Sequence, residues 1–275
     1  MKQLSAILFF LALVPAHAQD AQGDRVVVPF SDPSRPKTLK AGLINGGITV
    51  KGYDGKDAII ESRGRSGRES RRRAPEGSSG MHRLDVSGSG LQVEESDNTI
   101  TVSVGWRGMN NDTDIVIQVP YNTSVKLSTT NGGDLIVDHV TGDVELNNTN
   151  GNATATHISG SAIVHALNGK VLASLDRVTP DKPMSFSSLN GDIDVTLPAD
   201  VKARVKLKSD NGEIYSDFEV KLDAGARQPI VEDHRSEQGR YKVRFDRATY
   251  GTINGGGPEV QLTTFNGNIY IRKPK

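Results

Sequence analysis

Two carboxylates stand at a spacing that could cleave a glycosidic bond. Asp192 and Asp194 are separated by one residue in the segment SSLNGDIDVTLP. On a β-strand, such residues point to the same face about 6.6 Å apart, which is a separation at which paired acids hydrolyse glycans. Outward acids at alternating positions are also ordinary on soluble strands, and the short corners here offer little material to wall a cleft. We therefore expect no catalytic residue, with a carbohydrate-active enzyme as the alternative.

A pair of histidines could bind a metal ion. His139 and His157 occupy similar contexts, DHVTG and THISG, and Asp138 is the acid beside them. Two neighbouring imidazoles can hold a transition metal, but a closed site needs further ligands. We expect stacked side chains near a corner, with no metal and no cofactor. Calcium binding through a glycine-rich nonapeptide is not indicated either, because the chain lacks that repeat.

Nucleophilic catalysis has no support in the sequence. A hydrolase serine needs a G-x-S-x-G elbow between a strand and a helix, whereas Ser89 and Ser161 follow glycines without a predicted helix after them. The chain has no cysteine, which excludes a thiol nucleophile, a disulfide framework, cysteine-ligated zinc and an iron–sulfur cluster. Acyl transfer is therefore not expected.

A basic loop at about 61–83 is the clearest charged feature. It is rich in Gly and Ser, and six of its arginines could attract an anionic surface, an envelope glycan or another envelope protein. Nucleic acid is not an expected partner, because 33 basic residues balance 33 acidic ones and no aromatics interleave with the basic run. The plainer interpretation is a solvated loop. The candidate anion-binding residues are Arg63, Arg65, Arg68, Arg71, Arg72 and Arg73.

The elements that must position these residues form a repeat. Asn-Gly occurs eight times, and the central five dipeptides follow one another at intervals of 19, 18, 22 and 21 residues. The third and fifth residues after the Asn are mostly small and aliphatic, and polar residues separate them, so each repeat buries one face. The central corners are Asn131-Gly132, Asn150-Gly151, Asn168-Gly169, Asn190-Gly191 and Asn211-Gly212.

This pattern predicts an all-β fold, a β-solenoid or β-helix-like stack of repeats of about 20 residues. In such a stack, each corner asparagine can bond the asparagine of the next repeat, and glycine can adopt a positive φ. An antiparallel β-sandwich or meander is the alternative, because Asn-Gly is also the strongest short hairpin signal. The low aromatic content, 5%, agrees with a narrow aliphatic interior.

The first segment predicts export. Lys2 precedes an uncharged apolar run, and Ala16-His17-Ala18 has the pattern of a signal-peptidase site. The run is too short for a transmembrane helix. We therefore expect a signal peptide over residues 1–18 and one elongated β-repeat domain over residues 19–275. The location would be periplasmic, secreted or on the cell surface, with no transmembrane segment in the mature chain.

Several segments resemble a known family. The stretch TDIVIQVPYNTSVKLSTTNGGDLIVDHVTGDVELNNTNGNATATHISG, then SSLNGDIDVTLP and a closing LTTFNGNIYIRK, is similar to the bacterial putative-adhesin family. That family comprises exported β-strand-repeat proteins with a domain of unknown function. The resemblance implies a solenoid-like domain in the cell envelope and transfers no catalytic residues.

The predicted function is therefore a non-enzymatic exported envelope protein, an adhesin-like structural or binding module. The two alternatives are a carbohydrate-active enzyme built on a β-helix and a periplasmic protein-binding or sensor partner.

Overall fold

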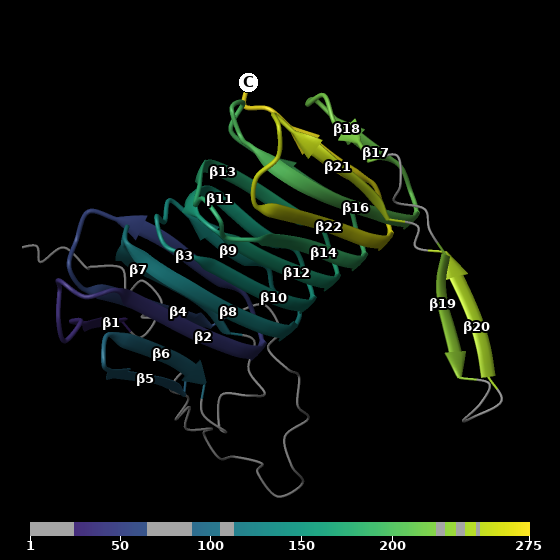
Figure 1. Cartoon of the computed structure of the whole chain (residues 1–275). Coiled ribbons are helices and arrows are strands. Elements are labelled where there is room, and N and C mark those ends of the chain that lie inside the picture. Colours follow the sequence, from purple (N-terminus) through teal and green to yellow (C-terminus); the bar gives the residue numbers. More distant parts are fainter. Residues whose placement is uncertain (1–24, 65–89, 105–112, 224–228, 235–239, 246–247) are drawn as a thin grey trace, which may run out of the picture.

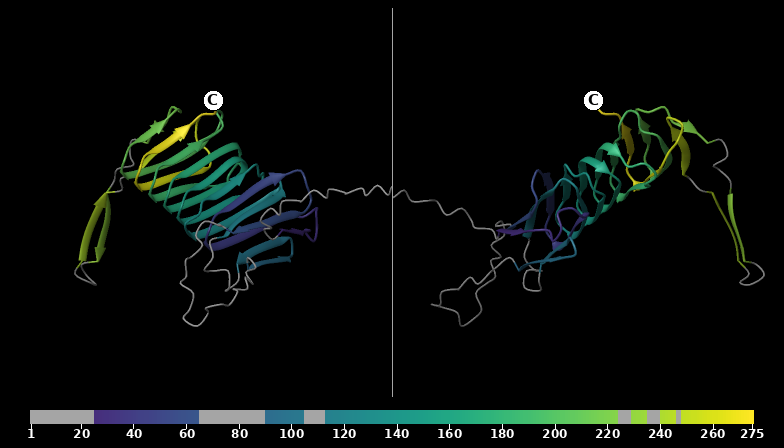
Figure 2. Two further views of the ribbon diagram at one scale, coloured as in Figure 1. Left: turned by 180° about the vertical axis from the view of Figure 1, so that it is seen from behind. Right: turned by 60° about the vertical axis from the view of Figure 1, so that its left-hand side comes forward.

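The chain folds into two long β-sheets that face each other across one core (Figure 1). The computed structural model describes residues 25–64, 90–104, 113–223, 229–234, 240–245 and 248–275. In this part of the chain, no helix is long and apolar enough to cross a membrane. Figure 2 shows the same two layers from two further sides.

The first sheet, sheet A, has ten strands. In spatial order they are β1 (Arg25–Val28), β4 (Ala58–Gly64), β7 (Thr113–Pro120), β3 (Ile48–Tyr53), β9 (Leu135–Asp138), β11 (Ala153–Gly160), β13 (Val171–Val178), β15 (Ile193–Thr196), β23 (Ile269–Arg272) and β17 (Ile214–Ser216).

The second sheet, sheet B, has eleven strands. In spatial order they are β18 (Lys221–Leu222), β21 (Thr249–Ile253), β16 (Ala203–Asn211), β22 (Glu259–Asn266), β14 (Met184–Asn190), β12 (Ala162–Asn168), β10 (Val144–Asn150), β8 (Thr123–Asn131), β2 (Lys37–Asn45), β6 (Thr99–Val104) and β5 (Leu91–Ser96). A separate hairpin pairs β19 (Pro229–His234) with β20 (Arg240–Phe245).

The chain alternates between the sheets, so that a strand of sheet B, an Asn-Gly corner and the next strand of sheet A make one rung. Rungs stack in parallel: β10 pairs with β8 and β12, and β11 pairs with β9 and β13. The prediction of a β-solenoid is thus confirmed. The antiparallel alternative is wrong for the stack, since antiparallel pairs occur only in the end strands of sheets A and B, such as β4 with β7 and β16 with β21.

The core is made of inward columns that run along the stack. The residues at the third and fifth positions after a corner asparagine lie inside, and Val171, Ala173, Ile193 and Val195 are at most 1% exposed. On sheet B, Phe186 is the largest fully buried side chain. The apolar alternation therefore sets the inside of each rung, and removing this aliphatic surface from water stabilises the stack.

Seven of the eight Asn-Gly asparagines form one continuous ladder. Over the last five members of the spatial order given below, Nδ2 of each asparagine donates to Oδ1 of the asparagine before it, at 2.7–2.9 Å. Asn254 is different: it follows β21 and donates to the carbonyls of Ala199 and Val201. The strand after Asn254, β22, buries Val260 and Leu262 but belongs to sheet B, whereas the strand after each ladder asparagine belongs to sheet A. In spatial order the ladder is Asn45, Asn131, Asn150, Asn168, Asn190, Asn266 and Asn211.

Most of the central corner glycines are not needed for a positive φ, which was the role expected from the sequence. A positive φ occurs at Gly132, with a value of 73°, but not at Gly151, Gly169, Gly191 or Gly212. At those four corners an added Cβ would lie 2.0–2.2 Å from the carbonyl oxygen of the neighbouring rung's glycine. Glycine is required there because the backbones of successive rungs touch, and not because of its conformational freedom.

The rungs at both ends are out of sequence order. The rung β2/β3 lies between β6/β7 and β8/β9, so the first rung in the chain is the second in the stack. At the other end, β22/β23 lies between β14/β15 and β16/β17. The last strands of the chain are therefore inserted into the stack one rung from its end.

Candidate functional site

Several predicted features lie outside the described residues. The signal peptide over residues 1–18 is one of them, and most of the basic loop is another. Arg63 lies in β4, which pairs with β7, whereas the other five arginines fall in the range 65–89. The role of these arginines therefore remains a prediction.

The two carboxylates with glycosidase spacing both make contacts between strands. Asp192 Oδ1 accepts the backbone N–H of Asn268 at 2.9 Å, in the neighbouring rung. Asp194 accepts two bonds from Nε of Arg272, at 2.8 and 3.0 Å. Lys170 Nζ lies 3.9 Å from Asp192, and the Glu213 N–H bonds the side chain of Asn268. These acids thus join successive strands, as the other corner residues do.

A group of aromatic and charged side chains gathers on the outer face of sheet A near β17. Tyr215 and Tyr270 stack with their ring centroids 5.3 Å apart and an angle of 8° between the rings. Arg272 lies over the Tyr270 ring at 5.0 Å and pairs with Asp194. We call Asp194, Tyr215, Tyr270 and Arg272 the tyrosine patch. The sequence alone does not predict this patch, because its residues are distant in the chain and meet only through the inserted rung.

The charges of the tyrosine patch are locally balanced. The Asp194 carboxylate raises the pKa of Arg272 above its ordinary value, so the guanidinium stays charged. The Tyr215 hydroxyl donates to the Glu213 carboxylate, and this bond raises the pKa of Tyr215. Tyr215 nevertheless remains 48% exposed. The patch therefore offers an aromatic surface that is fixed in place and still open to solvent.

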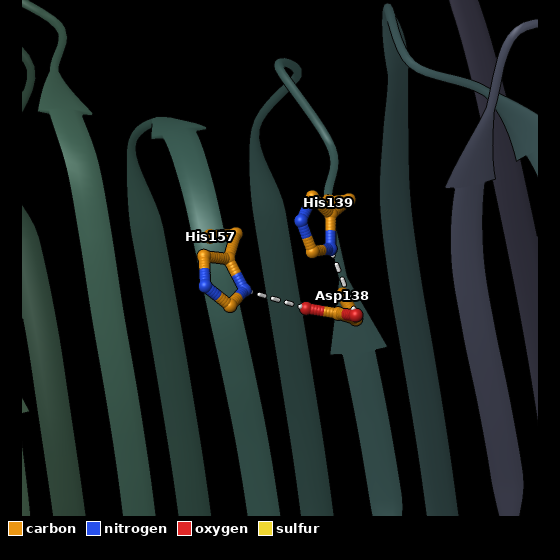
Figure 3. Close-up of side chains that lie close together, drawn as sticks. All are labelled: Asp138, His139 and His157. Atoms are coloured by element: carbon orange, nitrogen blue, oxygen red, sulfur yellow. Dashed lines mark hydrogen bonds and ion pairs between the residues drawn. The ribbon is translucent and has the colours of Figure 1, made fainter.

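A second group of side chains lies at the end of β9 and in the neighbouring part of β11 (Figure 3). Nδ1 of His139 is 2.8 Å from Asp138 Oδ2, and Nδ1 of His157 is 2.9 Å from Asp138 Oδ1. The two imidazoles stack at 4.2 Å between ring centroids. We call Asp138, His139 and His157 the histidine cluster. The expected stacking of the histidines is present, and a single carboxylate joins both rings.

The histidine cluster owes its geometry to two consecutive β-bulges. His157 is an extra residue in β11, because Ala155 pairs with Ala173 while Ile158 pairs with Leu175. Both histidines have a left-handed backbone, with φ of 56° at His139 and 52° at His157. A bulge re-aims a side chain, and here it turns both rings toward Asp138. The sequence carries a signal for it, since the buried residues there step by three positions instead of two.

The carboxylate of the histidine cluster is strongly held as an anion. Burial alone would raise the pKa of Asp138, but hydrogen bonds from His157, His139 and Thr156 outweigh it and lower that pKa to about 2. The bond to Asp138 in turn raises the pKa of His157. The other described imidazole, that of His165, lies on sheet B with Nδ1 2.8 Å from Ser187 Oγ.

A related acid allows a test of pH dependence. Burial alone would raise the pKa of Asp143, but bonds from Lys182 and Ser161 outweigh it and hold that pKa below its ordinary value of 3.8. A lowered pKa means that the ionised group stabilises the fold above pH 3.8, and that this contribution is lost as pH falls through the folded-state pKa. Asp143→Asn should therefore lower the free energy of unfolding near neutral pH by at most about 1 kcal/mol, since the pair is roughly half exposed.

Urea unfolding of Asp143→Asn and the unchanged chain between pH 7 and pH 2.5 measures this. The difference between the two should shrink below pH 3.8. A difference that stays constant down to pH 2.5 would contradict the assignment.

The parallel stack of two-strand rungs, with an asparagine ladder and one aliphatic core, defines a β-solenoid-like repeat protein. Residues 129–272, just over half of the chain, match the model described as Toastrack DUF4097. The chain belongs to this family, and the earlier resemblance to a putative-adhesin family of unknown function is confirmed. None of the curated proteins matches the sequence.

Two solved structures are similar in shape. One is a putative cell adhesion protein from Clostridium sporogenes, with a TM-score of 0.44 and 14% identity over 92% of this chain and 100% of that one. The other is a putative adhesin from Bacteroides fragilis, with a TM-score of 0.38 and 13% identity over 93% of this chain and 98% of that one.

Proposed function

We propose that the chain is an exported, non-enzymatic envelope protein that acts as an adhesin-like binding module. The observation that carries this proposal is the tyrosine patch. It presents stacked aromatic rings beside an ion pair on a sheet whose strands are held on their inner side by a packed core. Exposed aromatic side chains and arginine are the residue types most enriched in binding surfaces, and a rigid backbone limits the entropy lost on binding.

The enzymatic alternative receives less support from the geometry. A glycosidase needs two carboxylates free to face one sugar, one as acid and one as base or nucleophile. Asp192 is held by the Asn268 N–H, and Asp194 by Arg272. These contacts join neighbouring rungs and give both acids a structural role. We therefore favour binding over turnover at this face.

A protein partner is the second candidate, and the edge of sheet A favours it. β17 pairs with β23 on one side, and sheet A ends there. Ile214 occupies the inward column of Ile193 and Ile269, yet it is 37% exposed, and no further rung covers it in the described part of the chain. An uncovered strand edge next to apolar surface can pair with a strand of another protein.

The test is binding of the chain from residue 19 onward to a panel of glycans and cell-envelope fractions. Tyr215→Ala combined with Tyr270→Ala should weaken capture at least about tenfold, as expected for removal of two aromatic contacts. Phe265→Ala is the matched control, because Phe265 is equally exposed at 47% but lies on sheet B. A variant with the six basic-loop arginines changed to Gln separates the contribution of that loop.

The possible outcomes distinguish glycan binding, protein binding and catalysis at this face of sheet A. Loss of glycan capture in the tyrosine variant alone supports the adhesin-like proposal. Capture of an envelope protein, with no glycan bound, would transfer the proposal to the protein-partner candidate. Release of shortened glycan that stops in Asp192→Asn and Asp194→Asn would overturn the non-enzymatic proposal.

A further inference from the structure

We infer that the histidine cluster is a binding site for one divalent transition-metal ion, of which Zn²⁺ is the natural example. The inference is independent of the proposed binding function, because the cluster lies on β9 and β11, away from the tyrosine patch on β15, β23 and β17. It also departs from the expectation drawn from the sequence, in which two stacked histidines lacked enough further ligands.

The donor set fits a transition metal. Asp138, His139 and His157 each offer one ligand atom, and these atoms lie within 4.8 Å of one another. Two ligands of a tetrahedral zinc ion are about 3.4 Å apart, since Zn–N bonds are roughly 2.0–2.1 Å. The ion therefore needs only small side-chain movements. Two imidazoles and one carboxylate suit zinc, nickel and copper rather than magnesium or calcium.

The backbone holds these donors in place at a conformational cost. Left-handed φ values at His139 and His157 are conformations that Gly or Asn adopts more readily. The next rung has no left-handed residue in β13, where Leu175 lies two positions after Ala173. Strained residues of this kind concentrate at functional sites.

The surroundings supply what a metal site requires beyond its ligands. Thr156 donates from Oγ1 to Asp138 Oδ1 at 2.8 Å and so orients the carboxylate. The negative charge of Asp176 acts on the His157 ring and favours a cation there. The side chains of His139 and His157 are 55% and 51% exposed, so water can complete the coordination of the ion. The site is thus an open one with three protein ligands, unlike a closed structural zinc site.

Isothermal titration of the untagged full chain with ZnCl₂ tests the inference. We expect one Zn²⁺ per chain, and affinity at least about tenfold lower in His139→Asn, His157→Asn and Asp138→Asn, because each removes one ligand. Asn tolerates the left-handed backbone, so the histidine variants keep the bulges. His165→Asn is the matched control, since it removes an imidazole from sheet B and should leave the affinity unchanged.

Two further readouts keep the test independent of folding. Cu²⁺ bound to the unchanged chain should give an electron paramagnetic resonance spectrum with two nitrogen donors, and His157→Asn should reduce them to one. Saturating Zn²⁺ should raise the melting temperature of the unchanged chain and of His165→Asn, but not that of His157→Asn. The inference is overturned if the unchanged chain does not bind Zn²⁺, or if the three cluster variants bind it as tightly as the unchanged chain does.

Discussion

Gly169→Ala is expected to lower the free energy of unfolding by about 3 kcal/mol, which is the upper range for a group forced into a packed interior. A Cβ at this position would lie 2.1 Å from the Gly151 carbonyl oxygen and 2.5 Å from its carbon. Gly151 cannot retreat, because it is itself in the same close contact with Gly133. The rungs would have to separate, which would also weaken the asparagine ladder.

Gly132→Ala is the matched control for this prediction. Gly132 has a φ of 73°, but an added Cβ would meet nothing within 4 Å. Its cost is the strain of a left-handed alanine, about 1–2 kcal/mol. Urea unfolding followed by circular dichroism measures both variants. If Gly132→Ala proved the more damaging of the two, backbone conformation rather than contact between rungs would be the reason for these glycines.

Phe186→Ala is expected to cost about 3–5 kcal/mol, as truncation of a buried phenylalanine ring does elsewhere. The ring is 0% exposed and lies in the inward column between Val164 of β12 and Leu262 of β22. The backbones on both sides are fixed by parallel pairing, so the cavity cannot easily collapse. The loss should appear as a lower denaturation midpoint with an unchanged dependence on urea concentration.

Phe265→Ala again serves as the control, now for stability. It removes the same ring from a neighbouring strand, but the ring is 47% exposed. We expect a change within about 0.5 kcal/mol, which is typical of surface positions. Equal destabilisation by the two substitutions would mean that the inward column of sheet B is not the main core of the stack.

The sequence predicted the repeat and its buried positions well, because both are local. An aliphatic residue at the third and fifth place after each corner asparagine is enough to decide which side of the strand faces inward. Ile193 and Val195 illustrate this, since each is 0% exposed. Ile214 fits the same pattern but lies in the terminal rung, so its exposure depends on a neighbour that the local pattern does not describe.

The order of the rungs could not be predicted in the same way. Each rung presents an asparagine corner and an aliphatic inner face, so β14 can be matched by β16 or by β22 with similar side chains. The choice of β22 brings Phe186 against Leu262 and Asp194 against Arg272. Such preferences arise from packing between segments distant in the chain. The tyrosine patch could not be predicted from the sequence for the same reason.

The sequence predicted only part of the histidine cluster. The matching contexts of His139 and His157 placed the two rings in one column, and Asp138 was the acid beside them. The bulge at His157 was not predicted, although the buried residues Ala155 and Ile158 are three positions apart rather than two. That single added residue is what turns the imidazoles toward the carboxylate.

The insertion of the last strands into the stack has a consequence for the time course of folding. A chain made from its N-terminus can wind the rungs from β8/β9 to β14/β15 one after another as they emerge. β16 and β17 cannot take their final places then, because β22 and β23, which lie between them and β14/β15, are synthesised later. This end of the solenoid is therefore assembled only after residues 259–272 have been synthesised, because their insertion completes the parallel pairing of the last rungs.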